Sequence, residues 1–142
     1  MFFEEIQLNQ VIEVEPTVIE EEEMLAFARR YDNIPLHTDE EYCKTTRFGR
    51  IIAPGVMSFM AVWANYLKVD ISGEQLVAGK TTRMEWHKPV YANDVLYCRA
   101  VVTGKNKTGK HSGLVQLTFT IKNQNDELVM TNVTEMVVRC KE

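Results

Sequence analysis

The residues of this 142-residue chain that could do chemistry gather first in one short stretch, from Tyr31 to Asp39. Asp32 and His37 stand five positions apart, on either side of Pro35, whose ring stiffens the segment between them. A carboxylate and an imidazole held close together can bind one water molecule and transfer its protons, which is general acid–base chemistry. By itself the spacing is common, and a lone histidine more often has a structural hydrogen bond than a catalytic role.

A second stretch, Phe48 to Gly55, leads directly into a strongly apolar run. Gly55 stands where a buried helix is expected to begin, so backbone N–H groups there have no side chain in their way. A helix N-terminus of this kind can stabilise negative charge on a substrate oxygen. The second stretch therefore offers an oxyanion-binding group to accompany the acid and the imidazole of the first.

Other polar residues near these stretches have weaker claims to a role. Arg47 and Arg50 lie beside the proposed site, where they could contact phosphate groups of a substrate. Ser58, one turn into the apolar run, could contact substrate, but a bond to its own helix backbone is favoured. His87 has no partner at metal-ligand spacing and is expected at a surface or an interface. His111 belongs to a basic turn that is expected to be solvated.

The elements that must position these residues are helical and irregular in the first half. Apolar residues alternating with Glu predict a short strand, and acids followed by bases around Met24 to Arg30 favour a helix by the macrodipole rule. Thr38 is a candidate N-cap for another short helix. The run from Val56 to Leu67 is apolar nearly all round, which predicts a helix buried on most sides, with Met57, Met60 and Trp63 in the core. The expected elements are a strand at 11–18 and helices at 24–30, 39–46 and 56–67.

The second half is rich in Val, Thr, Leu, Tyr and Phe, with partial alternation of apolar and polar residues. Turn signals such as Ala92-Asn93-Asp94 and Asn123-Gln124-Asn125-Asp126 separate the apolar segments. Four consecutive strands joined in this way predict an antiparallel meander wrapped around the central helix. The chain is thus expected to be one α+β domain spanning residues 1–142, with strands at 76–88, 94–104, 112–123 and 128–139.

Composition excludes several classes of function. Sixteen Lys and Arg against twenty Asp and Glu give a net charge of −4, which repels the phosphate backbone of a nucleic acid. Three cysteines without a C-x-x-C pair indicate neither a zinc site nor a disulfide framework, which favours a cytoplasmic location. The acidic start does not resemble a signal peptide, and no apolar run is long enough for a membrane span.

Taken together, three stretches resemble the MaoC-like dehydratases, the hot-dog-fold family that includes the (R)-specific enoyl-CoA hydratases. The resemblance covers nearly the whole chain and implies a long central helix wrapped by an antiparallel sheet, usually paired with a second copy. The residues that carry it are Tyr31-Asp32 with Pro35, His37 and Asp39; Phe48-Gly49 with Ile52-Ala53 and Gly55; and Lys88-Pro89-Val90-Tyr91-Ala92-Asn93-Asp94-Val95-Leu96.

The resemblance also implies a reaction. Asp32 and His37 match the family's catalytic acid and histidine, which activate the water that adds across the 2,3 double bond of an enoyl thioester. Gly55 matches the residue whose backbone N–H polarises the thioester carbonyl. The substrate is expected to be an acyl-CoA or acyl carrier protein thioester, with no metal and no redox cofactor. A homodimer or a dimer of such dimers is expected, because a single small hot dog leaves an edge strand and one side of its helix uncovered.

Two residues depart from the family pattern. Ile34 stands where the family commonly has Asn, and Pro54 stands where many hydratases have His. These departures leave room for a non-catalytic acyl-CoA-binding module, and a hot-dog acyl-CoA thioesterase is a further alternative because it also binds acyl thioesters. The pairing of Asp32 with His37 in one loop favours hydration over thioester hydrolysis.

Overall fold

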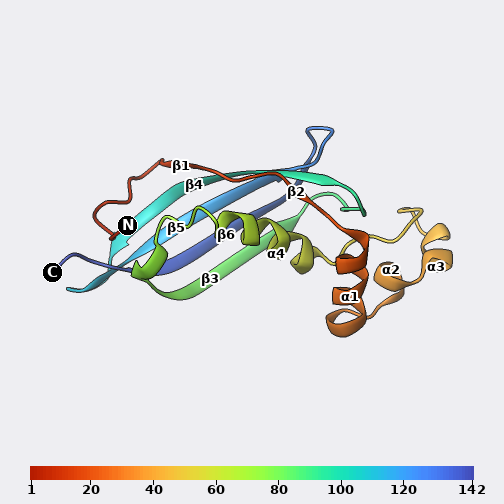
Figure 1. The fold of residues 1–142 in the computed structure, drawn as a ribbon, viewed down its shortest axis with the longest axis horizontal. Coiled ribbons are helices and arrows are strands. Elements are labelled where there is room, and N and C mark those ends of the chain that lie inside the picture. Colours follow the sequence, from red (N-terminus) through yellow and green to blue (C-terminus); the bar gives the residue numbers. More distant parts are fainter.

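The computed structural model, which describes residues 1–142, is built on a long curved antiparallel sheet. One helix lies along a face of this sheet, three shorter helices gather beyond one end, and both chain termini lie at the other end (Figure 1). The hydrogen-bonded strand order is β1-β4-β5-β6-β3, and β2 also pairs with β4. The strands are β1 Val11–Glu13, β2 Thr17–Val18, β3 Leu76–Trp86, β4 Val95–Lys107, β5 Ser112–Lys122 and β6 Leu128–Arg139.

The pairing of β3 differs from the predicted meander. Strands β4, β5 and β6 pair in chain order, but β3 pairs with β6, from Leu76 opposite Val138 to Trp86 opposite Met130. Strand β3 cannot join β4 because the other edge of β4 is occupied by β1 and β2. The segment after Trp86 therefore carries the chain from one edge of the sheet to the other.

The strand predicted at 11–18 is in fact two short strands. β1 ends at Glu13 and β2 begins at Thr17, and both pair with β4. Pro16 lies between them, and proline has no N–H with which to continue a ladder. The chain therefore leaves the ladder for three residues, 14–16, before it pairs with β4 again at Thr17.

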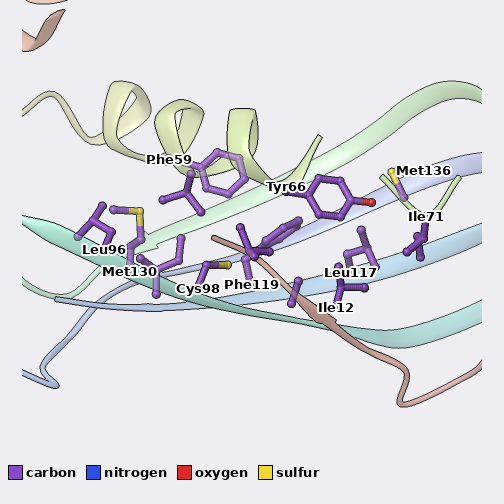
Figure 2. Close-up of a cluster of buried hydrophobic side chains, with 14 of the residues drawn as sticks. Ile12, Phe59, Tyr66, Ile71, Leu96, Cys98, Leu117, Phe119, Met130 and Met136 are labelled. Atoms are coloured by element: carbon purple, nitrogen blue, oxygen red, sulfur yellow. The ribbon is translucent and has the colours of Figure 1, made fainter. Parts of the chain in front are cut away.

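The long helix α4, Gly55–Tyr66, packs its buried side on the concave face of the sheet. Figure 2 shows Phe59 and Tyr66 of α4 between the helix and the sheet, near Phe119 of β5. The Phe119 ring centroid lies 5.7 Å from that of Phe59 and 5.3 Å from that of Tyr66, both edge-on. Alternate residues of β5 are fully buried against this helix, as expected for a strand with one face in the core.

The other side of α4 is more exposed than its sequence suggested. Met57 is buried as predicted and Trp63 is partly buried, but Met60 is 48% exposed, so its predicted core position is wrong. Val56 and Leu67 are exposed on the same helix. The sheet covers α4 from one side only, which leaves apolar side chains on the opposite side without a partner in this chain.

The remaining helices are α1 Glu21–Tyr31, α2 Pro35–Thr38 and α3 Glu40–Lys44, with a 3₁₀ turn, η1, at Gly73–Gln75. Helix α1 has acids in its first turn and bases in its last, as predicted from the macrodipole. Thr38 is not the cap of α3. It ends α2, and Asp39 caps α3 by accepting the Tyr42 N–H at 3.0 Å. None of the helices is both long and apolar enough to span a bilayer.

Candidate active site

Asp32 and His37 are placed by the ends of two consecutive helices. Asp32 caps the C-terminus of α1, where its backbone N–H donates to the carbonyl of Ala28 at 3.0 Å. Helix α2 then begins at Pro35, a residue suited to the first helical position because the N–H there has no helical partner. His37 follows within this single turn and is 7% exposed. The short helix therefore turns the imidazole inward, close to the end of α1.

Two contacts orient the imidazole ring of His37. Nδ1 lies 2.7 Å from the carbonyl oxygen of Ile52, and a carbonyl only accepts, so Nδ1 carries a hydrogen and donates it. Nε2 lies 3.3 Å from Oδ2 of Asp32. Because Nδ1 donates to Ile52, Nε2 is the ring atom that can take up a proton, and in its protonated form it donates to the Asp32 carboxylate.

The backbone of Ile52 is held in place by contacts with two other segments. Its N–H donates to the carbonyl of Leu36 at 3.1 Å, and it forms an isolated antiparallel bridge with Tyr91. The neighbouring Ala53 N–H donates to the carbonyl of Val90 at 2.7 Å. The segment before α4 thus ties α2 to the residues that precede β4, which holds the acceptor of His37 in place.

Gly55 begins α4, and the preceding Pro54 provides no side-chain cap for the first N–H groups of the helix. A Cβ atom on residue 55 would overlap Nε1 and Cε2 of Trp86, because the five-membered part of the indole lies against the glycine. Only glycine permits this close approach. The first backbone N–H groups of a 12-residue helix are therefore uncapped beside the Trp86 ring.

A cavity of about 420 Å³ brings the predicted catalytic residues together. Asp32, His37 and Gly55 all contribute to its wall. Trp86 also lines the cavity, although no pattern in the sequence points to it. An aromatic residue at the end of a strand carries no signal of such a role, since its contact with Gly55 arises only from tertiary packing.

The weaker candidates are distributed unevenly around this cavity. Arg47 and Ser58 line it, whereas Arg50 lines a neighbouring cleft. Ser58 is fully buried, and its hydroxyl donates to the carbonyl of Pro54 at 3.1 Å, the helix-backbone bond favoured from sequence. His87 lines the cavity and its Nε2 lies 3.1 Å from Oγ1 of Thr131. His111 is remote, bonded through its carbonyl to the N–H of Cys140 near the chain termini.

Comparison with known proteins shows the family to which this chain belongs. Residues 7–132 match the model of the FAS1-like dehydratase domain region. The chain belongs to this dehydratase family. The resemblance to the MaoC-like dehydratases and the hot-dog fold inferred from sequence are both confirmed.

Three solved structures illustrate how closely the fold of this dehydratase-family chain is matched. A monoamine oxidase regulatory protein from Archaeoglobus fulgidus is 30% identical, with a TM-score of 0.94 over 100% of this chain and 96% of that one. A MaoC-like dehydratase from Rhodospirillum rubrum is 23% identical, with a TM-score of 0.85 over 100% and 99%. The (R)-hydratase PhaJ1 from Pseudomonas aeruginosa is 23% identical, with a TM-score of 0.79 over 99% and 86%.

Proposed function

We propose that this protein is an (R)-specific hydratase of trans-2-enoyl thioesters, acting in reverse as a 3-hydroxyacyl dehydratase. The observation that carries the proposal is one cavity in which Asp32 and His37 accompany the uncapped start of α4 at Gly55. Hydration needs a group to take a proton from water, a group to return one to carbon, and donors for the thioester oxygen. In this proposal, Asp32 and His37 fill the first two roles and the N–H of Gly55 fills the third.

In the proposed reaction, Asp32 and His37 hold one water molecule near C3 of the substrate. The water oxygen bonds to C3 as one of its protons passes to the Asp32–His37 pair, with Nε2 of His37 as the acceptor. The electrons of the 2,3 double bond move toward the thioester oxygen, where the N–H of Gly55 stabilises the charge. The pair then returns a proton to C2, so the addition of water is balanced without an external oxidant or reductant.

The two departures from the family pattern do not remove a group from this scheme. Ile34 is 42% exposed, and its backbone braces the loop: its N–H donates to the Asp32 carbonyl at 2.9 Å, and its carbonyl accepts the His37 N–H at 2.9 Å. Pro54 is buried and accepts the Ser58 hydroxyl bond. Main-chain bonds therefore stabilise the loop at the position where a side-chain amide is common.

We further propose a homodimer with the acyl site at the subunit boundary. Strand β3 is exposed along nearly its whole length and pairs on one edge only, with β6. The exposed apolar side chains of Val56, Met60 and Leu67 leave a side of α4 uncovered as well. A second copy that covered both features would remove an open strand edge and bury apolar surface.

The test incubates the protein with crotonyl-CoA and follows two signals, the absorbance of the conjugated enoyl group and the release of free thiol. Hydration removes the absorbance without releasing thiol, thioesterase activity releases thiol, and a binding module changes neither signal. Chiral analysis of the 3-hydroxybutyryl product then checks the stereochemistry. A racemic product would contradict the proposed arrangement, because water held by one pair reaches only one face of the double bond. An (S) product would contradict the (R) assignment, which the family resemblance implies.

A further inference from the structure

A second cleft, of about 390 Å³, adjoins the candidate active site. Lys88 and Pro89 line both spaces and form the wall between them. The far side of the second cleft is formed by the turn between β5 and β6, which supplies Asn123, Gln124, Asn125 and Glu127. The cleft is therefore polar, open to solvent and separated from the site only by Lys88 and Pro89.

The two carboxylates of this cleft already have partners. Glu127 accepts hydrogen bonds from Nζ of Lys88 and, at 3.1 Å, from Nδ2 of Asn123. The Lys88 ammonium holds the pKa of the Glu127 carboxyl below its usual range. Asp94 is buried and accepts the Nε2–H of Gln124 and the backbone N–H of Tyr91, both at 2.9 Å. These acids are thus engaged within the protein.

Two cations, Arg50 and Lys88, line the cleft. Lys88 is paired with Glu127, whereas Arg50 has no carboxylate partner. The guanidinium carbon of Arg50 lies 4.0 Å from the centroid of the Tyr91 ring. The Tyr91 hydroxyl donates to the carbonyl of Phe48 at 3.2 Å, which fixes the ring on which the guanidinium stacks. Stacking uses the face of a guanidinium and leaves the N–H groups at its edge free to bind an oxyanion in a bidentate manner.

We propose that Arg50 binds a phosphate of the carrier arm of the thioester substrate in this second cleft. The inference rests on thioester hydration as the function of the neighbouring site. The arm would leave the active site past Lys88 and Pro89 and reach Arg50 on the other side of the shared wall. Phosphate is the chemistry that CoA and the phosphopantetheine arm of a carrier protein have in common.

The test compares crotonyl-CoA with crotonyl-pantetheine, which has the same reacting group and no phosphate, in the wild type and in Arg50→Gln. Loss of a charge-assisted bidentate contact should raise KM for crotonyl-CoA by about 10-fold or more, with kcat changed by less than about twofold. KM for crotonyl-pantetheine should stay the same. Arg99→Gln, which removes an equal charge from an exposed position of β4, controls for the overall field and should leave both KM values within about twofold.

Crotonyl-4′-phosphopantetheine identifies which phosphate is bound. If this substrate shows the same dependence on Arg50 as crotonyl-CoA, the site holds the phosphate shared with a carrier protein. If only crotonyl-CoA shows the dependence, the site holds a phosphate of the nucleotide end. Equal changes in KM for all three substrates, or no change for any, would overturn the proposal.

A calorimetric titration with CoA itself tests the phosphate site independently of the proposed reaction, because the measurement of binding requires no turnover. Binding that weakens by about 10-fold in Arg50→Gln, but not in Arg99→Gln, would support the phosphate site even if no crotonyl thioester were hydrated. Equal binding by the wild type and Arg50→Gln, or no binding by the wild type, would contradict it.

Discussion

The indole of Trp86 occupies the space that a side chain on residue 55 would need. Gly55 begins α4 and Trp86 ends β3, so this contact fastens the start of the helix to the edge strand of the sheet. Any larger residue at position 55 would therefore force the indole to move, whether or not the Gly55 N–H takes part in catalysis. The steric role and the oxyanion role of Gly55 therefore have to be separated experimentally.

Gly55→Val should lower hydratase activity by about 10²-fold or more, because the new side chain displaces the indole and crowds the approach to the helix N–H groups. Melting temperature and kcat are measured for Gly55→Val and for Gly55→Val combined with Trp86→Ala. The second change opens space, so stability should recover in the double variant while activity stays low. Recovery of both together would show that Gly55 serves folding alone.

Asp32→Asn and His37→Ala should each lower kcat with crotonyl-CoA by about 10²-fold or more, as loss of a general acid–base group usually does. Asp32 caps α1 with its backbone and its side chain is 42% exposed, so the isosteric change should leave the melting temperature nearly unchanged. His111→Ala, a histidine change far from the cavity, is the matched control. Near-normal kcat in either site variant would show that the catalytic assignment is wrong.

The dimer proposal predicts a particle of twice the 16.4 kDa chain mass in solution at micromolar concentration. Met60→Glu places a charge on the uncovered side of α4 and should shift the protein toward monomer, as measured by light scattering. Leu8→Glu is the control, since Leu8 is 55% exposed and precedes β1 at the other edge of the sheet. An active wild-type protein that is strictly monomeric would refute the dimer.

The three cysteines should resist thiol reagents in the native protein. Cys43, Cys98 and Cys140 are free and buried, and burial raises the pKa of the Cys98 thiol to about 12. At about pH 8 an ordinary thiol is partly ionised, but a raised pKa keeps Cys98 in its unreactive protonated form. Labelling with Ellman's reagent should be slow before denaturant is added and should reach three equivalents afterwards. Rapid native labelling would contradict the packing around these residues.

Local patterns in the sequence were sufficient to locate most elements and to place Asp32, His37 and Gly55 among the candidate site residues. Apolar alternation located β4 to β6, and the order of acids and bases located α1, because both signals lie within one segment. The family resemblance rested on residues in three such segments, and comparison with known proteins confirmed the family and the hot-dog fold.

Only the tertiary structure decided how these segments meet. Strand β3 pairs with β6 because β1 and β2 occupy the free edge of β4, a competition among segments far apart in the chain. The exposure of Met60 depends on which side of α4 the sheet covers, which the apolar composition of the helix cannot specify. The orientation of His37 depends on the carbonyl of Ile52, and the need for glycine at position 55 depends on Trp86. Backbone carbonyls are the same in every residue, and a contact between distant segments leaves no local pattern.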